Sequence, residues 1–382
     1  MVVGIIGAGA MGTGIAQLAA MAGCEVRLYD TNKVSGSGAL HNIGESIQKF
    51  ISKGVFSPEE GVAVRGRIYI CEKLETLSDA DMIIEAIIED LNIKKELFKA
   101  LEKTIRNETI LATNTSSLSI TTIAAGLKYP ERFIGIHFFN PPVIMKLVEV
   151  IPAVQTDSQL TLKVQKIIES WGKTVVIAKD TPGFIVNKLA RPFYSEAIRI
   201  YEEGIADIVT IDYAMTSRGF RMGPFTLMDF IGHDVNYKVT ESVWRGFYND
   251  SRYRPSISQL RLLEAGYLGK KTGKGFYNYS DEVIPPFTEK DNLLLLQDIF
   301  VRIISMLINE SADTVAQQIC SPTDADLAVR LGLNYPKGLL EWGKELGYKN
   351  IVKVLDDYFD IYHEERYRVS RYLRNLAVHE DI

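Results

Sequence analysis

The first 180 residues alternate short apolar runs with amphipathic stretches. Several runs are β-branched throughout, which is typical of strands buried on both faces of a sheet. The candidate strands are Val2–Gly7, Glu25–Tyr29, Ile68–Cys71, Met82–Ile87, Thr109–Ala112, Phe133–Phe139, Lys146–Ile151 and Thr174–Ala178. Between them lie helical patterns such as Asn92–Arg106, with apolar side chains at Ile93, Leu97, Leu101 and Ile105. This alternation predicts a doubly wound, mostly parallel α/β sheet.

The pattern changes after Asp180. A Thr-Pro-Gly turn signal at 181–183 is followed by helical periodicity with few strand-like runs. Residues 278–290 contain two prolines and several charges, as a linker would, and helical patterns resume at Leu293. We therefore expect an α/β domain followed by an all-α region. The predicted divisions are 1–180 for the α/β domain, 181–280 for the first helical domain, 281–294 for a linker and 295–382 for a second helical segment.

The two helical segments have features of a degenerate repeat. Glu196 precedes Asp212 by 16 positions, and Glu310 precedes Asp326 by the same interval. Further matches, in a register with a two-residue gap, are Ala214 with Ala328, Gly223-Pro224 with Tyr335-Pro336, and Asp229 with Glu341. The pattern favours two related helical segments, with chance similarity as the alternative.

The composition is that of an ordinary globular protein, with 46% hydrophobic and 24% charged residues. A formal net charge of −5 gives no basic field for nucleic acid. The cysteines Cys24, Cys71 and Cys320 are odd in number and contain no C-x-x-C, so neither a disulfide framework nor a metal site is expected. No apolar stretch approaches the ~20 residues of a membrane span. We therefore expect a cytoplasmic protein without nucleic-acid, membrane or metal partners.

Gly7, Gly9 and Gly12 form a G-x-G-x-x-G motif after the first predicted strand. Such glycines allow a tight turn and let a helix N-terminus approach a pyrophosphate, as in Rossmann-type domains. Asp30 directly follows the second predicted strand, 18 residues after Gly12, where a carboxylate can accept hydrogen bonds from a ribose diol. Asp30, followed by Thr31 and Asn32, favours NAD over NADP, because its carboxylate would repel a 2′-phosphate. A glycine-rich turn without ligand is the alternative.

His137 lies near the end of a buried strand, and Glu149 lies inside the next apolar strand, twelve residues later. A buried carboxylate is costly unless it is paired, and a histidine general base needs a partner that fixes its tautomer. These two residues could therefore form a catalytic pair. In the alternative, His137 is a core histidine and Glu149 pairs with Lys146 or Lys173.

Three polar residues follow strand ends or the predicted turn. Ser116 and Ser117 could hold a substrate oxygen or cap the next helical pattern, Leu118–Ala125. Asn187 lies one turn into the helix after the Thr-Pro-Gly turn, where its amide could face the domain boundary. A solvated helix residue is the alternative for Asn187.

Ser46 and Lys53 lie seven residues apart on the helical pattern Leu40–Lys53 and therefore share a face. Two such donors, spaced by two helical turns, could grip phosphate groups. A solvated charged face would show the same spacing.

Seven segments, in this order, resemble the 3-hydroxyacyl-CoA dehydrogenase family over roughly residues 1–280. They are GAGAMGTGIAQLAA, IIEAIIEDLNIKKELF, NTSSLSI, HFFNPPVIMKLVEV, KDTPGFIVNKL, GPFTLMDFIG and LGKKTGKGFYNY. Several long motifs in order are more specific than a glycine fingerprint alone. The resemblance implies an NAD-dependent oxidoreductase that interconverts (S)-3-hydroxyacyl-CoA and 3-ketoacyl-CoA in fatty-acid or related metabolism.

The resemblance also assigns roles to residues. It implies that His137 removes the hydroxyl proton, that Glu149 orients it, and that Ser116 and Asn187 bind the reacting oxygen. The implied cofactor contacts are Gly7, Gly9, Ala10, Met11, Gly12, Asp30, Glu89, Lys94, Asn140 and Lys271. The implied coenzyme A contacts are Ser46 and Lys53.

The chain departs from the shorter family members, which end near the GFYNY segment and form homodimers. About 100 residues follow here and resemble the tandem arrangement of longer members. The second helical segment lacks an LGKKTGKGFYNY equivalent, so we interpret it as a packing element that can replace the usual dimer face. A homodimer remains the alternative.

Three other functions compete with this interpretation. A dehydrogenase of similar architecture could oxidise a free hydroxy acid, although such enzymes use a catalytic lysine. The chain could also be a catalytically silent NAD-binding or structural relative. A third alternative is the detached part of a multifunctional β-oxidation protein that needs a hydratase partner.

Overall fold

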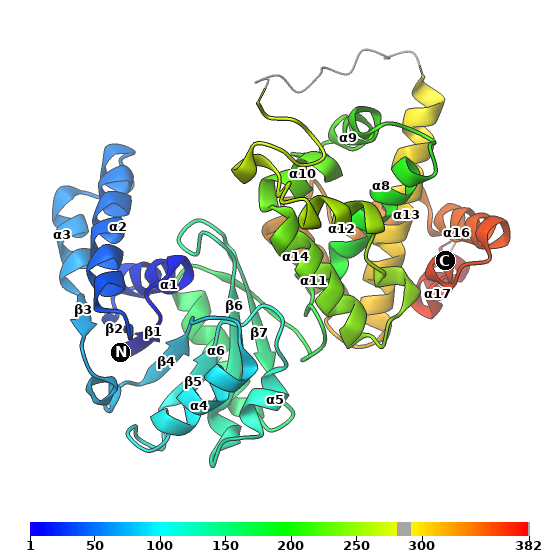
Figure 1. The fold of residues 1–382 in the computed structure, drawn as a ribbon. Coiled ribbons are helices and arrows are strands. Elements are labelled where there is room, and N and C mark those ends of the chain that lie inside the picture. The colour runs from blue at the N-terminus through cyan, green and yellow to red at the C-terminus, as the bar shows by residue number, and fades with distance from the viewer. Residues whose placement is uncertain (281–291, 381–382) are drawn as a thin grey trace. The chain divides into compact units, whose positions relative to one another are not determined.

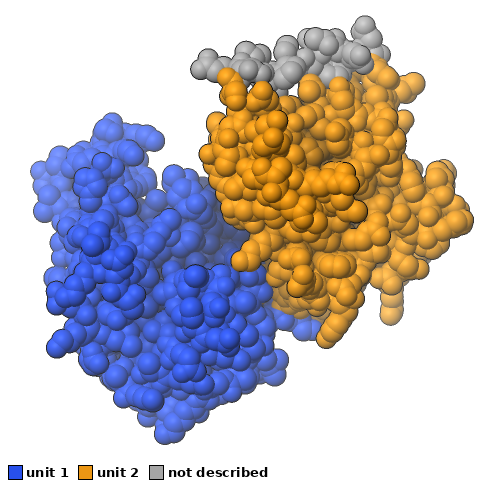
Figure 2. All heavy atoms as spheres, viewed as in Figure 1, with its two compact units in different colours: residues 1–180 blue, residues 181–382 orange. Residues whose placement is uncertain are grey.

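The computed structural model describes residues 1–280 and 292–380 of the chain (Figure 1). The chain divides into two compact units, Met1–Asp180 and Thr181–Ile382, which Figure 2 distinguishes by colour. The first unit is built around a sheet and the second is helical. The predicted linker, 281–294, lies mostly outside the described residues, and helix begins again at Leu293.

The first unit contains an eight-stranded sheet with strand order β3-β2-β1-β4-β5-β6-β7-β8. The strands are β1 Val2–Ile6, β2 Glu25–Tyr29, β3 Ile68–Cys71, β4 Met82–Glu85, β5 Ile110–Thr113, β6 Phe133–Phe138, β7 Leu147–Pro152 and β8 Thr174–Ile177. Every neighbouring pair is parallel except β6 and β7, which are antiparallel. The predicted α/β sheet is therefore confirmed, and all eight predicted segments form strands.

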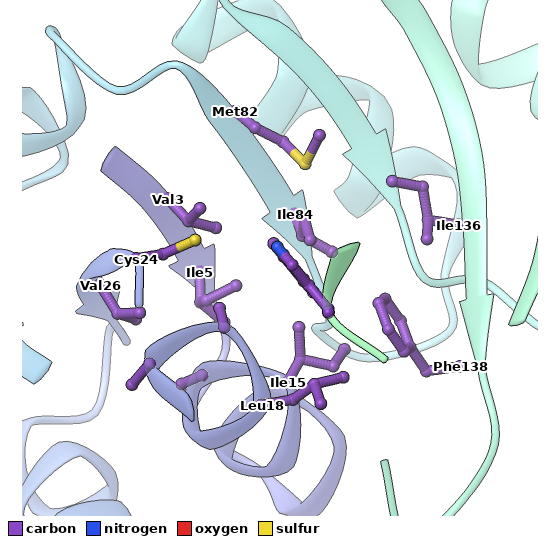
Figure 3. Close-up of a cluster of buried hydrophobic side chains, with 14 of the residues drawn as sticks. Val3, Ile5, Ile15, Leu18, Cys24, Val26, Met82, Ile84, Ile136 and Phe138 are labelled. Carbon is purple, nitrogen blue, oxygen red and sulfur yellow. The ribbon is translucent and has the colours of Figure 1, made fainter. Parts of the chain in front are cut away.

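Helices cover the sheet and form the first hydrophobic core with it. They are α1 Ala10–Met21, α2 Lys33–Ser52, α3 Pro58–Gly66, α4 Leu91–Leu101, α5 Ile120–Ala124 and α6 Ser158–Ser170. Figure 3 shows how Ile15 and Leu18 of α1 lie against Val3, Ile5 and other apolar side chains of the strands. All of these side chains are at most 4% exposed, so α1 and the glycine motif before it are fixed to the sheet.

Two predicted helix boundaries are wrong, and side-chain capping explains both. The helix predicted for Asn92–Arg106 ends at Leu101, whose carbonyl accepts hydrogen bonds from the backbone and the hydroxyl of Thr104. The helix predicted to begin at Leu40 begins seven residues earlier. It starts there because the side chain of Asn32 accepts a hydrogen bond from the amide of Val34.

The second unit is all-α, as predicted. The described part before the gap contains α7 Val186–Leu189, α8 Arg191–Glu202, α9 Ile208–Thr216, α10 Pro224–Ile231, α11 His233–Gly246 and α12 Ile257–Glu264. The part after it contains α13 Leu293–Ala316, α14 Pro322–Gly332, α15 Leu339–Leu346, α16 Tyr348–Tyr362 and α17 Arg371–Val378. The long helix α13 contacts α7, α8 and α9 as well as α14 to α17, so it joins the two segments (Figure 1).

The predicted register between the two segments is wrong beyond Asp326. Asp212 accepts hydrogen bonds from the amides at 225 and 226, at the start of α10. Asp326 accepts them from the amides at 340 and 341, at the start of α15. These capping contacts pair Gly223 with Gly338, and a Cβ on either glycine would lie 2.3 Å from the carboxyl carbon of its aspartate. The second segment therefore has one more residue than the first between the aspartate and the glycine. For this reason Gly223-Pro224 does not correspond to Tyr335-Pro336.

Candidate active site

The glycine motif forms a backbone cradle at the end of β1. Gly7 has φ +103°, and a Cβ on Gly12 would lie 1.8 Å from the carbonyl oxygen of Gly7. Nothing lies within 4 Å of a Cβ built on Gly9, so the space above that residue is open. The backbone therefore requires glycine at the first and third positions and leaves room for a ligand at the second.

Asp30 closes the cradle from the end of β2. Its carboxylate accepts hydrogen bonds from the amides of Ala8 at 2.7 Å and Asn32 at 2.8 Å. A cavity of about 740 Å³ lies beside it, lined among others by Gly7, Gly9, Ala10, Met11, Asp30, Ile88 and Ile93. An apolar wall with one carboxylate at the edge fits an adenosine, whose ribose diol can donate to Asp30.

Lys94 is buried next to the cavity, and its charge is neutralised inside the protein. Its ammonium lies 2.5 Å from Glu85 and 3.4 Å from Glu89. Glu85 is fully buried at the end of β4 and also accepts a hydrogen bond from the hydroxyl of Thr113 at 2.7 Å. The sequence analysis missed Glu85, although a carboxylate inside the apolar run MIIEAII signals a buried partner.

Glu89 organises the loop that follows β5. It accepts hydrogen bonds from the hydroxyl of Thr115 at 2.6 Å and from the amides of Ser116 at 3.0 Å and Ser117 at 3.2 Å. Burial opposes ionisation, but Lys94 and these donors outweigh it and hold the pKa of Glu89 below its usual value. Glu89 therefore carries a negative charge and fixes the position of Ser116.

The possibility that Ser116 or Ser117 caps the next helix is not supported by the structure. Helix α5 begins at Ile120, and its N-cap is Ser119, whose side chain accepts a hydrogen bond from Thr122. Ser116 and Ser117 lie before this cap and bond to Glu89 instead. Their hydroxyls are therefore placed at the carboxyl end of β5, where ligands of α/β sheets bind.

His137 and Glu149 form a buried pair across the β6–β7 hairpin. They are directly opposite in the antiparallel register, and the His137 Nδ1 lies 2.6 Å from a Glu149 carboxylate oxygen. Glu149 is 0% exposed and His137 is 6% exposed. This contact fixes the orientation of the imidazole ring.

The alternative partner considered for Glu149, Lys173, holds the hairpin loop instead. Its ammonium donates hydrogen bonds to the carbonyls of Pro142 at 2.6 Å and Met145 at 2.8 Å. Burial lowers the pKa of Lys173 to about 8. Asn140 lies in the same loop and is exposed. The lysine thus fixes the loop that connects β6 and β7.

The second unit carries the two remaining candidates, Asn187 and Lys271. Asn187 is half-buried in the short helix α7, and its carbonyl accepts a hydrogen bond from Arg191 at 2.8 Å. Lys271 is partly exposed and pairs with Asp234 at 2.5 Å. The backbone of Asn187 and the side chain of Lys271 are thus held by contacts within the helical unit.

Asp229 fixes the loop that carries Lys271. Its carboxylate accepts hydrogen bonds from the amides of Phe276 and Tyr277, both at 2.9 Å, and contacts His233 at 2.8 Å. A Cβ on Gly275 would lie 2.1 Å from the same carboxylate. The GKKTGKGFYNY segment is therefore packed closely around the buried carboxylate of Asp229, and its glycines make this close packing possible.

Ser46 and Lys53 lie on or at the end of α2. Ser46 is half-buried, and Lys53 is the exposed C-cap residue. A hollow of about 850 Å³ follows neighbouring positions of the helix, lined by Leu40, His41, Gly44, Glu45, Gln48, Lys49 and Ser52. Lys49 is a further cation on this helix that the sequence analysis did not select.

Two family models together cover most of the chain. The model for the 3-hydroxyacyl-CoA dehydrogenase NAD binding domain matches residues 2–181, and the model for the C-terminal domain of the same enzymes matches residues 183–279 and 299–382. The chain belongs to the 3-hydroxyacyl-CoA dehydrogenase family. The family resemblance is therefore confirmed, as is NAD as the cofactor, and the glycine cradle fits that cofactor.

Several members of this family are similar over long stretches. A 3-hydroxyadipyl-CoA dehydrogenase of Escherichia coli is 35% identical, with 99% of this chain and 98% of the relative covered. A probable 3-hydroxybutyryl-CoA dehydrogenase of Bacillus subtilis is 43% identical over 73% of this chain and 97% of its own. The crystal structure of a 3-hydroxybutyryl-CoA dehydrogenase from Escherichia coli matches with a TM-score of 0.94 at 34% identity, covering 100% of this chain and 99% of that one.

Two further features concern partners. None of the helices in the described residues combines the length and apolar character needed to cross a membrane. Within residues 1–280 and 292–380, no group of three or more His, Cys, Asp or Glu side chains could hold a metal ion.

Proposed function

We propose that this dehydrogenase interconverts (S)-3-hydroxyacyl-CoA and 3-ketoacyl-CoA, with His137 as the general base. The observation that carries the proposal is the buried pair of His137 and Glu149. A secondary alcohol releases hydride readily only as it loses its proton, so a base aligned with the hydroxyl is essential. General-base catalysis of this kind contributes about 10²–10⁴-fold.

Each residue has a defined part in this proposal. Glu149 contacts Nδ1 and orients the ring, so that Nε2 of His137 exchanges the proton with the substrate. Ser116 and Asn187 donate hydrogen bonds to the reacting oxygen. NAD, when bound, would supply the acceptor for the hydride that leaves C3 of the substrate. Asp30 disfavours a 2′-phosphate by charge repulsion and thereby selects NAD over NADP.

The acyl-CoA substrate is supported by the names of the relatives and by the cations of α2. Lys49 and Lys53 lie on or at the end of that helix, and Ser46 is close to them in sequence. The named relatives act on hydroxybutyryl-CoA and hydroxyadipyl-CoA, so acetoacetyl-CoA and 3-oxoadipyl-CoA are the two acceptors to compare.

The test is the loss of NADH absorbance with acetoacetyl-CoA, repeated with free acetoacetate and with NADPH. We expect turnover with the thioester and NADH alone. His137→Gln should lower kcat by about 100-fold or more while NADH still binds, because the variant lacks only the base. Turnover of free acetoacetate would favour the hydroxy-acid alternative, and NADH binding without any turnover would favour a silent NAD-binding relative.

We also propose that the second helical segment takes the place of a dimer partner, and that the protein acts in the cytoplasm. The α13 contacts with α7, α8 and α9 support the first point, because they bury the helices of the first segment within one chain. Light scattering at increasing concentration should give the mass of one chain, 42.8 kDa. A mass of twice that value would support a homodimer.

A further inference from the structure

Lys188 lies directly after Asn187 in α7, and it is fully buried. Its ammonium donates a hydrogen bond to Glu310 and another, at 2.8 Å, to the hydroxyl of Thr314. Both partners belong to α13, in the second helical segment. The helix that carries a proposed substrate-binding residue is therefore attached to a part of the chain more than 120 residues away.

Glu310 is held in its charged form by several donors. Burial opposes ionisation, but Lys188 and Arg252 outweigh it, and the pKa of Glu310 lies below its usual value. The hydroxyl of Tyr253 donates a further hydrogen bond to it at 2.6 Å. Removing one partner of such a pair leaves an uncompensated buried charge, which is strongly destabilising for the local structure.

Helix α7 depends on this attachment for its orientation. It has four residues, and so short a helix is not stable without tertiary contacts. Neighbouring residues of a helix point in directions about 100° apart, so anchoring Lys188 against α13 also sets the direction of Asn187. On the other side, the Asn187 carbonyl accepts a hydrogen bond from Arg191, which is itself held by Thr240.

A second ion pair corresponds to that of Lys188 and Glu310, but here the cation comes from the second helical segment and the glutamate from the first. Arg302 lies 114 positions after Lys188, and Glu196 lies 114 positions before Glu310. The side chains of Arg302 and Glu196 are buried and lie 2.6 Å apart. Arg366 and Tyr367 contact Glu196 just as Arg252 and Tyr253 contact Glu310. The residue before Arg302 is Val301, which has no hydrogen-bonding side chain. This second pair is therefore an internal control.

We infer that Glu310 is a positioning residue for the substrate, acting through Lys188 to hold Asn187 in place. The inference rests on the proposed function, because it takes Asn187 to bind the reacting oxygen. It gives the second helical segment a role in catalysis beyond packing. The equivalent carboxylate, Glu196, pairs with Arg302 of α13, and the residue before Arg302 is Val301, so Glu196 positions no hydrogen-bonding side chain in this way.

The experiment compares Glu310→Gln with Glu196→Gln. We expect both variants to lose stability to urea by similar amounts. Glu310→Gln should lower kcat/KM for acetoacetyl-CoA by about tenfold or more, since small displacements of positioning groups have effects of this size, while NADH affinity stays unchanged. Glu196→Gln should remain within about twofold of the wild type. Equal losses of activity in folded variants, or no loss in Glu310→Gln, would overturn the inference.

A double-mutant cycle tests the route through Asn187. If Glu310 acts by positioning Asn187, Glu310→Gln should have little further effect in an Asn187→Ala background. Additive losses would show that Glu310 acts elsewhere. Thr314→Val, which removes one hydrogen bond to Lys188 and keeps the charge pair, gives a milder change in the same direction if Glu310→Gln does not fold.

Hydrogen exchange separates this inference from the proposed function. Amides of residues 183–191 should exchange faster in Glu310→Gln than in Glu196→Gln, whether or not acetoacetyl-CoA is a substrate. A wild type without turnover would refute the proposed function alone. Unchanged exchange in α7 would refute the attachment itself.

Discussion

The two helical segments of the second unit share a framework but differ in one loop. In both, an aspartate caps the helix after a glycine, and each presents a buried glutamate to cations of the other. In the first segment Asp229 is fully buried and holds the loop of Lys271. By the capping register its counterpart in the second is Lys344, which is exposed. The capping and ion-pair contacts are thus present in both segments, whereas the loop held by the Asp229 carboxylate belongs to the first segment alone among the described residues.

The largest effect should come from removing that carboxylate. Asp229→Ala would leave two amides, the Tyr279 hydroxyl and His233 without their buried acceptor, so we expect a loss of about 3–5 kcal/mol in unfolding free energy. Lys344→Ala should change it by less than about 0.5 kcal/mol. Urea unfolding measures both. A loss below about 1 kcal/mol for Asp229→Ala would show that the loop is held by other contacts.

The second-largest effect on unfolding free energy should come from the two capping aspartates, Asp212 and Asp326. Asp212 accepts hydrogen bonds from two amides, the Thr226 hydroxyl and the Tyr277 hydroxyl, whereas Asp326 is half-buried and accepts from two amides. We expect Asp212→Ala to cost about 2–3 kcal/mol and Asp326→Ala about 1 kcal/mol, because each unsatisfied buried donor adds a penalty. Thermal unfolding of the two variants under identical conditions would check the order, and equal losses would contradict it.

The ion pair of Glu310 should make the stability of the folded chain depend on pH. Its pKa is lowered in the folded state by Lys188 and Arg252 against the opposing effect of burial. A lowered folded pKa means that the stabilisation is present above the usual value of 4.5 and is lost as the pH falls through the folded pKa. The stability gap between wild type and Glu310→Gln should therefore narrow on acidification. A gap that is constant from neutral pH down to acid unfolding would refute this.

The smallest effect should come from exposed pairs on the corresponding helices. Glu241 and Arg245 of α11, and Lys353 and Asp357 of α16, are spaced one turn apart at 2.8 Å. Exposed pairs of this kind contribute about 0.3–0.5 kcal/mol, less at high salt. Glu241→Ala and Asp357→Ala should therefore change the urea midpoint only slightly and to a similar extent. A loss above about 1 kcal/mol in either would indicate a buried network.

The sheet and the contact between His137 and Glu149 could be predicted from local sequence. Strand patterns depend on short runs of apolar residues, and a carboxylate inside such a run indicates a nearby partner. His137 and Glu149 satisfied both signals because they lie on consecutive strands joined by a short loop. The roles of Ser116, Asn187 and the coenzyme A contacts came from family resemblance instead, and they stay predictions.

Buried charge pairs between distant segments could not be predicted in the same way. Lys188 and Glu310 lie in helical patterns whose other charges are mostly solvated, and nothing in their spacing indicates which partner they meet. The predicted register of the repeat was wrong for a related reason, because it depends on contacts that the spacing of residues does not indicate. The prolines at 224 and 336 suggested a correspondence, but the capping contacts of Asp212 and Asp326 set the alignment.

The packing of α8 against α13 also has a consequence for the order of events during synthesis. Helix α8 is synthesised about 100 residues before α13, and at about 5–20 residues per second this interval lasts roughly 5–20 seconds. During that time Lys188, just before α8, has no acidic partner from α13. The NAD-binding domain can fold meanwhile, since its sheet is complete within residues 1–180. Nascent chains are thus expected to bind nucleotide before they become competent for turnover.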